Sequence, residues 1–285
     1  MNRARTDLQP VQIIVNADDF GYFDAVSQGI LEAAEAGMVT ATGVMANGPA
    51  LDRWIDRLKA LPGLSVGVHL NATLGAPLTP GMAEALAGSR GQFPSKGNLA
   101  SAVLLGRLPT ETLLTEWRAQ IRRCLDKGLR IEFVNSHEHV HVLPGLYAEV
   151  RRLAAELGIR HVRAPQSEWG PRFTPGGVLR STVFAVAGQF ARGAAAAEPV
   201  LIGVATSGRL SLDYCRWRFA RLRRSRAYEL MCHPGRADPL ALAIPQLAAY
   251  HDWEGELGML LSPAFTNLLR EQALRLASYA DLDRA

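Results

Sequence analysis

The sequence predicts an α/β fold in which about seven parallel strands alternate with helices, as in a single (β/α) barrel. Short apolar runs rich in valine and isoleucine alternate with segments of helical periodicity. The chain has 285 residues, which is long enough for one barrel domain. Acidic or imidazole side chains follow several of the apolar runs, at the ends where parallel folds gather functional groups.

The strand candidates are short and apolar, and turn-forming residues or helical patterns bound them. Because each is followed by a helical pattern or a long loop, parallel pairing is favoured over hairpins. In chain order the predicted strands are 11–16, 39–46, 64–70, 131–136, 159–164, 200–204 and 227–232.

Helices are predicted between these strands from apolar residues at helical spacing and from end signals. Asp24 and Thr110 are expected to cap two of them, and Ser262 followed by proline begins the last. Residues 72–109 and 165–177 have no strong period and are predicted as loops, and a loop as long as the first is uncommon unless it serves a site. The predicted helices are 25–36, 51–61, 110–127, about 144–157, a segment after 177, 212–224, and a final one from 263.

Composition places the chain among globular proteins, since 48% of its residues are apolar and 20% are charged. We expect one domain over residues 1–285, with 1–10 as a flexible N-terminal extension. The three cysteines are widely spaced, which argues against a disulfide framework or a Cys-rich zinc site and favours a reducing compartment. The sequence has no apolar segment of signal-peptide or membrane-spanning length, so we expect a soluble, cytoplasmic protein.

The net charge of +4 has a local source, because six arginines lie between Arg216 and Arg226, and without them the charge would be 4 − 6 = −2. Aromatic and leucine side chains interleave with them, so the segment could bind phosphates or contact an anionic membrane surface weakly. A solvated basic face on an amphipathic helix is the favoured alternative. No nucleic-acid partner is expected, and a homodimer is left open.

The most informative motif is His137-Glu-His139-Val-His141, directly after the predicted strand 131–136. In an extended strand, alternate side chains share a face, so the three imidazoles are expected to point the same way. Imidazole is the commonest ligand of zinc-like metals and the usual proton carrier near neutral pH. The alternative is one buried histidine beside solvated ones.

Other chemical groups follow other strands. Asp18 and Asp19 follow the first, His69 lies near the end of the third, and His233 follows the last, before a Pro-Gly turn. Carboxyl ends of parallel strands meet at one rim, so these groups are expected to converge on a metal-assisted hydrolase site. Taken singly, paired acids at a helix start or a lone strand histidine are more often structural.

Three further residues have other expected roles. Asn16 is either a turn former or a support for the site, whereas His161 and His251 are expected outside it. The sequence contains no G-x-S-x-G elbow, P-loop or dinucleotide-binding fingerprint, which argues against those classes of enzyme.

Four segments resemble the signature motifs of the YdjC-like carbohydrate deacetylases, which include the chitooligosaccharide deacetylases. They occur in the family's order and the resemblance spans about residue 11 to residue 280. It implies a TIM-like, irregular (β/α) barrel and the hydrolysis of an N-acetyl group from an amino sugar, which releases acetate. The four segments are Asn16–Gly21, Gly67–Leu70, Asn135–His141 and Glu229–Gly235.

Carried over by motif position, the resemblance implies that Asp19, His69 and His137 hold one divalent cation. Magnesium or zinc is expected, with cobalt or manganese as alternatives. By the same resemblance, Asp18 occupies the motif position of the catalytic base, and His233 occupies that of the acid. His139 and His141 belong to the motif, but their roles as ligands or site wall stay open. Glu138 departs from the family, which often has another histidine there.

Two regions, 72–109 and 202–209, do not resemble the members that act on soluble disaccharides. The second resembles the hopanoid-biosynthesis-associated branch, so a lipid-linked N-acetylglucosamine is as plausible a substrate as a chitooligosaccharide. Two other functions are considered: a metal-dependent phosphoesterase of barrel type, and a carbohydrate- or lipid-intermediate-binding protein without turnover. Phosphoesterases of that type usually place His-x-His on the first strand, where this chain has two aspartates.

Overall fold

The computed structural model describes residues 10–86, 88, 90–168, 175–191, 198–239 and 244–284. Its core is a parallel sheet in the order β5-β4-β3-β2-β1-β7-β6, with β8 beside β1. The predicted N-terminal extension lies outside the described residues, apart from Pro10. The strands are β1 (Val11–Phe20), β2 (Ala41–Val44), β3 (Ser65–Leu70), β4 (Ile131–Ser136), β5 (His161–Val162), β6 (Val200–Ile202), β7 (Tyr228–Cys232) and β8 (Leu274–Leu276).

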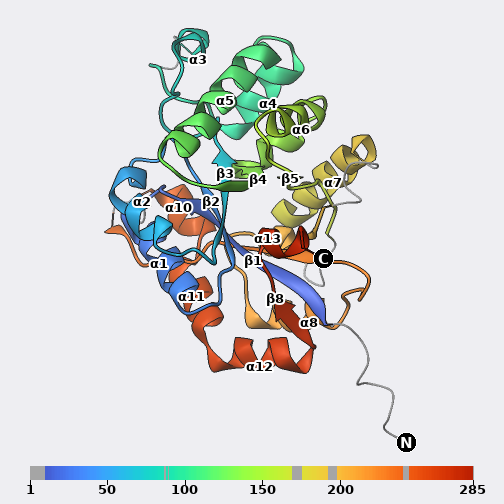
Figure 1. Ribbon diagram of the computed structural model, residues 1–285. Helices are drawn as coiled ribbons and strands as arrows, with labels where there is room; N and C mark the ends of the chain where they lie inside the picture. The colour runs from blue at the N-terminus through green and yellow to red at the C-terminus, as the bar shows by residue number, and fades with distance from the viewer. Residues whose placement is uncertain are drawn as a thin grey trace, which may run out of the picture.

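The sheet curls into a half-barrel with helices around it (Figure 1), which confirms the predicted TIM-like α/β fold. Among the described strands, β5 and β6 end the hydrogen-bonded path and do not pair with each other, so the barrel stays open there. The helices are α1 (Asp24–Glu35), α2 (Leu51–Lys59), α3 (Pro80–Ala85), α4 (Lys96–Leu104), α5 (Thr110–Asp126), α6 (Leu146–Glu156), α7 (Pro175–Phe190), α8 (Leu212–Phe219), α10 (Pro245–Tyr250), α11 (Trp253–Leu261), α12 (Pro263–Glu271) and α13 (Tyr279–Leu282).

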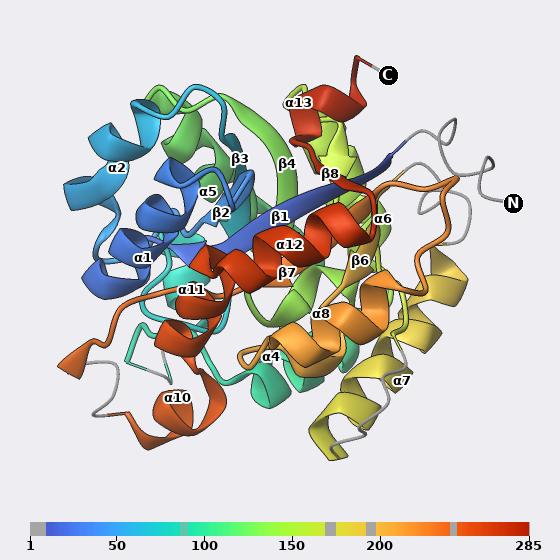
Figure 2. The same cartoon turned by 90° about the horizontal axis from the view of Figure 1, so that it is seen from below.

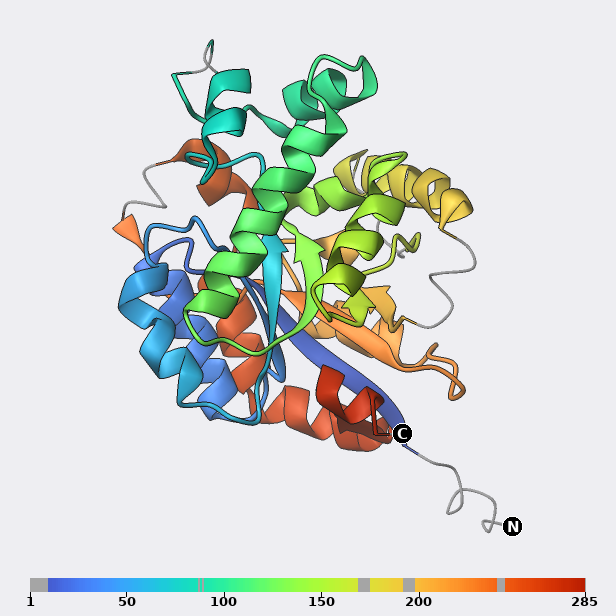
Figure 3. The same ribbon diagram turned by 45° about the horizontal axis from the view of Figure 1, so that its top comes forward.

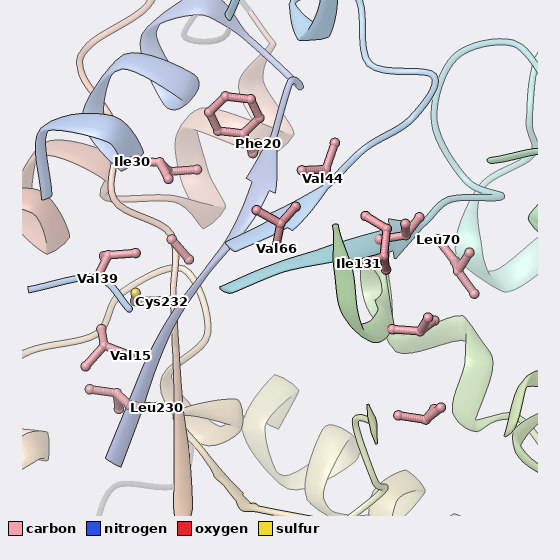
Figure 4. Packing of buried hydrophobic residues seen from close by; sticks show 14 of the residues in the cluster. Val15, Phe20, Ile30, Val39, Val44, Val66, Leu70, Ile131, Leu230 and Cys232 are labelled. Carbon is pink, nitrogen blue, oxygen red and sulfur yellow. The ribbon is translucent and has the colours of Figure 1, made fainter. Parts of the chain in front are cut away.

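The longer helices, among them α1, α5, α11 and α12, bury an apolar face against the sheet or against a neighbouring helix. In Figure 3, α5 lies across β3, and in Figure 2, α11 and α12 follow one another close to α1 and α8. Figure 4 shows Val15 and Phe20 of β1 with Val44 of β2 and Leu230 of β7 in the resulting core. Burying one such side chain contributes about 1.5–3 kcal/mol.

Several local expectations are wrong. Residues 72–109 are not one long loop, because α3 and α4 form there, each too short to give a clear periodic signal. Asp24 does not cap α1; Phe23 holds that position, and the Asp24 carboxylate accepts a hydrogen bond from Trp54 Nε1 at 2.7 Å. Pro109, rather than Thr110, precedes α5.

Other expectations hold. Ser262 caps α12 by accepting a hydrogen bond from the Phe265 amide at 3.2 Å. Within 165–177, residues 165–168 form neither helix nor strand, α7 begins at Pro175, and 169–174 lie outside the described residues. The short elements α10, α11, α13 and β8 were not predicted.

The basic segment forms a shorter helix than predicted, since α8 ends at Phe219. Part of its charge is engaged within the protein. Arg218 pairs with Glu168 at 3.2 Å, and the Arg221 guanidinium lies 5.1 Å from the centre of the Trp217 ring. Weak membrane contact through Arg216–Arg226 stays a prediction. In the part of the chain that the structure describes, no helix combines the length and apolar character needed to cross a bilayer.

Candidate active site

The end of β1 directs two adjacent carboxylates into one pocket. Asp18 and Asp19 both line it, although neighbouring side chains of a regular strand point to opposite faces. The backbone is irregular here: Asp19 has φ +74°, and the register between β1 and β2 shifts between Ala17 and Phe20. A left-handed aspartate costs roughly 1–3 kcal/mol, a strain found often at functional sites. The strand therefore bends at Asp19, within its last two residues.

The histidine motif is not extended, so the prediction that alternation aligns its three imidazoles is wrong. β4 ends at Ser136, and His137–Val142 forms a 3₁₀ helix interrupted by two left-handed residues, Glu138 (φ +52°) and His139 (φ +57°). These residues turn the chain and send the three rings in different directions. The motif still delivers His137 to Asp19, but for a different structural reason.

Asp19, His69 and His137 come together as the resemblance implies. One oxygen, Asp19 Oδ1, lies 2.9 Å from His137 Nδ1 and 3.2 Å from His69 Nε2. One ligand atom from each residue lies within 4.8 Å of the other two. Two imidazoles and a carboxylate are a donor set that suits zinc and similar divalent ions. The residues present therefore fit a single divalent cation.

The electrostatics of this trio favour mutual attraction. Burial raises the pKa of Asp19, but the charge and hydrogen bond of His137, with those of His69, hold that pKa well below its usual range. Burial lowers the pKa of His137, yet the Asp19 carboxylate more than offsets it and the pKa is raised. An ionised carboxylate with two facing imidazoles is the arrangement a cation would use.

Asn135 connects His69 to the second carboxylate. His69 Nδ1 lies 2.6 Å from Asn135 Oδ1, so the ring donates its Nδ1 proton and leaves the Nε2 lone pair for a cation. The Asn135 side-chain amide donates to Asp18 Oδ1 at 2.8 Å. The orientation of the metal ligand and that of Asp18 are therefore coupled through one side chain.

Asp18 lies in a buried polar network. Arg163 donates to its two carboxylate oxygens at 2.7 and 3.0 Å, and Asn16 Nδ2 donates at 2.9 Å. Glu229 accepts hydrogen bonds from Arg163 Nε at 2.9 Å and from Asn16 at 3.0 Å. Burial raises the pKa of Asp18, but Arg163 and His69 hold it far below its usual range. Asp18 is thus an ionised acceptor at neutral pH, and Asn16 supports it from behind.

Sequence reasoning missed Arg163 and Glu229. Both are buried, at 2% and 1% exposure. Arg163 follows β5, and Glu229 lies within the apolar strand β7. The available signal was a charged residue inside an otherwise apolar strand pattern, since such a residue is rarely buried unless it is paired.

His139 and His141 have different environments. His139 lines the pocket and its ring meets Phe184 edge-on, with centroids 5.0 Å apart. His141 is fully buried outside the pocket lining, where its ring nitrogens contact Ser136 Oγ at 2.5 Å and the Arg163 carbonyl at 2.9 Å. Burial lowers the pKa of His141 to about 3, so this ring is neutral and positions the backbone of Arg163.

His233 lines the pocket beside an unexpected second imidazole. Its backbone amide donates to Glu256 Oε2 at 2.6 Å. The His251 ring lies 5.2 Å from the His233 ring and lines the same pocket, so the prediction that His251 lies outside the site is wrong. His161 does lie outside, and contacts Glu198 and Asp283 at 3.0 and 3.2 Å.

The pocket has a volume of about 500 Å³, which is typical of a small-molecule site. Its polar end holds the carboxylates and imidazoles, and the remaining wall is largely apolar. At one side Lys96 of α4 approaches Glu138 at 3.3 Å. The apolar wall is formed by Ala100, Val140, Val142, Leu143, Val183, Phe184 and Leu247.

Comparison with known proteins finds similar sequences over most of the chain. A family model described as YdjC-like protein matches residues 12–271. A chitooligosaccharide deacetylase from Klebsiella pneumoniae is 33% identical, over 95% of this chain and 98% of its own. A carbohydrate deacetylase from Geobacillus stearothermophilus is 38% identical over 54% of this chain and 61% of its own.

Among solved structures, one from Enterococcus faecalis V583 shares the fold. It has a TM-score of 0.73 and 23% identity, and covers 96% of this chain and 99% of its own. The family model spans nearly all of the described barrel, from β1 to the end of α12. The chain therefore belongs to the YdjC-like protein family.

Proposed function

We propose that this protein is a metal-dependent hydrolase that removes the N-acetyl group from an N-acetylated amino sugar and releases acetate. The observation that carries the proposal is the presence of Asp19, His69 and His137 in one pocket with Asp18 and His233. The names of the relatives, chitooligosaccharide deacetylase and carbohydrate deacetylase, support the same reaction class.

Asp19, His69 and His137 would hold the cation. A bound divalent cation lowers the pKa of a water molecule and polarises a carbonyl oxygen. The two imidazoles favour zinc, cobalt or manganese over magnesium, which prefers oxygen ligands, although magnesium stays an expectation from the resemblance.

Asp18 is the proposed general base. Its ionised carboxylate accepts the proton of the attacking water, while Arg163 and Asn135 fix its orientation. His233 is the proposed acid. As the carbon–nitrogen bond breaks, the nitrogen keeps the electron pair and takes a proton from His233, leaving a free amine and acetate.

Two types of N-acetylated substrate, a soluble sugar and a lipid-linked sugar, are supported by different observations. The name of the Klebsiella relative favours a soluble chitooligosaccharide. The apolar wall formed by Val183 and Phe184 of α7 with Leu247 of α10 favours an amino sugar that carries an apolar group, such as a lipid-linked N-acetylglucosamine.

The test is acetate release from a panel of N-acetylated sugars and N-acetylglucosaminyl lipids, with each of the four metals supplied. Asp18→Asn should keep its metal and lose turnover, whereas His161→Gln, outside the pocket, should keep both. Near-native rates of acetate release by the Asp18→Asn variant would show that Asp18 is not the general base. Phosphate release without acetate release would support a phosphoesterase, and sugar binding without either would support a silent binding protein.

A further inference from the structure

His251, whose imidazole lies beside that of His233 in the pocket, has no role in the proposed reaction so far. We infer that His251 binds the substrate directly, by donating a hydrogen bond from Nε2 to a sugar oxygen next to the acetamido group. The inference deepens the proposed function and rests on it for the nature of the substrate.

The position of His251 is built into the fold. His233 follows β7 and His251 follows α10, and the two loops are joined where the Gly235 amide donates to the Trp253 carbonyl at 3.1 Å. The two rings have centroids 5.2 Å apart and planes at 62°. A sugar oxygen adjacent to a nitrogen at His233 can therefore reach His251.

The His251 ring is held in a defined orientation. It stacks on Trp253, with centroids 4.9 Å apart and planes at 7°, and Tyr250 meets it edge-on at 4.8 Å. Trp253 is itself fixed, because it is 4% exposed and lies against Gly235, where an added Cβ would come within 3.1 Å. A ring clamped in this way loses little freedom when it binds a ligand.

The surroundings of the two ring nitrogens of His251 indicate which nitrogen contacts the substrate. Nδ1 is buried, and the described residues offer it no hydrogen-bond partner. Nε2 makes no hydrogen bond within the described residues and is not among their buried, unpartnered atoms, and the ring lines the pocket. A proton on Nδ1 would be an orphaned buried donor, which is rarer and more costly than an unpaired acceptor. The favoured tautomer therefore carries its proton on Nε2, toward the pocket.

The two neighbouring imidazoles differ in what they can do. Burial, followed by the nearby His233, lowers the pKa of His251 to about 3. His251 is therefore neutral at physiological pH and cannot deliver the proton that the leaving amine needs. A phenyl ring would pack on Trp253 without leaving a nitrogen unpaired, so packing alone does not explain the histidine.

His251→Phe tests the inference because it keeps the ring and its stacking but removes both nitrogens. With N,N′-diacetylchitobiose we expect KM to rise about five- to tenfold and kcat to change little, as for the loss of one neutral hydrogen bond made throughout the reaction. Hydrolysis of 4-nitrophenyl acetate, which has no sugar oxygen, should be unchanged. His161→Gln is the control outside the pocket.

Each other outcome excludes the inference. Equal losses on the sugar and the ester would show a structural role for His251, and a lower kcat on the sugar alone would show a role in proton transfer. Unchanged kinetics on both substrates would show no contact.

Sugar binding separates this inference from the proposed reaction. Calorimetry with N,N′-diacetylchitobiose compares Asp18→Asn with the double variant Asp18→Asn, His251→Phe. If the wild-type protein releases no acetate, the proposed function fails, yet weaker binding in the double variant would still support contact with His251. Equal affinities, or no binding to either protein, would overturn the inference.

Discussion

Arg163 holds the carboxylate of Asp18 through two hydrogen bonds, of 2.7 and 3.0 Å, and both side chains are buried. A guanidinium that contacts both oxygens of a carboxylate fixes its plane as well as its charge. Asp18, the proposed base, is therefore oriented by Arg163, which follows β5 on the opposite side of the half-barrel.

Arg163→Lys should lower kcat/KM about tenfold or more, because an ammonium group cannot reproduce the paired contacts. Arg163 lowers the pKa of Asp18, so a weaker contact should raise that pKa and move the acidic side of the kcat/KM profile to higher pH. The pH profile of the variant checks this. Arg151→Lys alters a more exposed pair with Glu198 and is the control. An unmoved profile would contradict the role assigned to Arg163.

Asn135→Ala should weaken metal binding about 10- to 100-fold, as expected when the partner of a ligating histidine is removed. Without Asn135 Oδ1, the His69 ring loses the contact that fixes its tautomer. Isothermal titration with zinc measures the effect. Asn267→Ala, at an exposed site, is the matched control, and equal affinities in the two variants would argue against His69 as a ligand.

The sequence predicts the positions of Asp19, His69 and His137 well, because parallel strands bring their carboxyl ends to one edge whatever the details of the loops. It does not predict how His137 is delivered, because the turn depends on left-handed conformations at Glu138 and His139, which few non-glycine residues adopt. An expectation based on strand alternation fails at the residue where the strand ends.

Arg163 and His251 show a second limit. Each reaches the site through long-range packing: Arg163 pairs with residues of β1 and β7, and His251 stacks on Trp253 at the start of α11. A local pattern can mark Arg163 as a charged residue in a predicted apolar strand, but it does not show which distant residues either side chain contacts. The fold is easier to predict, because apolar periodicity marks its longer strands and helices, whereas α3, α10 and α13 are too short to show a period.

Gly43 of β2 lies directly beneath the site. A Cβ there would lie 3.1 Å from Asn135 Oδ1, 3.2 Å from His69 Cβ and 3.3 Å from Asp18 Oδ1. Gly43→Ala should therefore displace these groups slightly and lower kcat/KM about tenfold or more, since small misplacements of catalytic groups are costly. Gly63→Ala, where a Cβ would meet nothing within 4 Å, is the control. Equal rates in both variants would contradict the tight packing of the site.

His141 should make stability depend on pH. Its pKa is about 3 in the folded protein, against an ordinary value near 6.5. Between these values the unfolded chain binds a proton that the folded protein does not, so stability falls as the pH falls. Urea denaturation at pH 7.5 and pH 5 should show a contribution of about 2 kcal/mol from this residue. His141→Gln should lose less stability over that interval, and an equal loss would indicate that His141 is protonated in the folded state.

Because the described strands β5 and β6 do not pair, the contacts of Arg163 help to hold the β5 edge to the rest of the sheet. Across the interior of this open barrel, the Arg163 guanidinium reaches from the β5 edge to Asp18 on β1 and Glu229 on β7. Ion pairs thus connect the strands through the interior, and the carboxylate of Asp18, the proposed base, forms one of them. Neutralising Asp18 should therefore speed amide hydrogen exchange along the β5 edge, because the Arg163 side chain would lose one of its two charged partners.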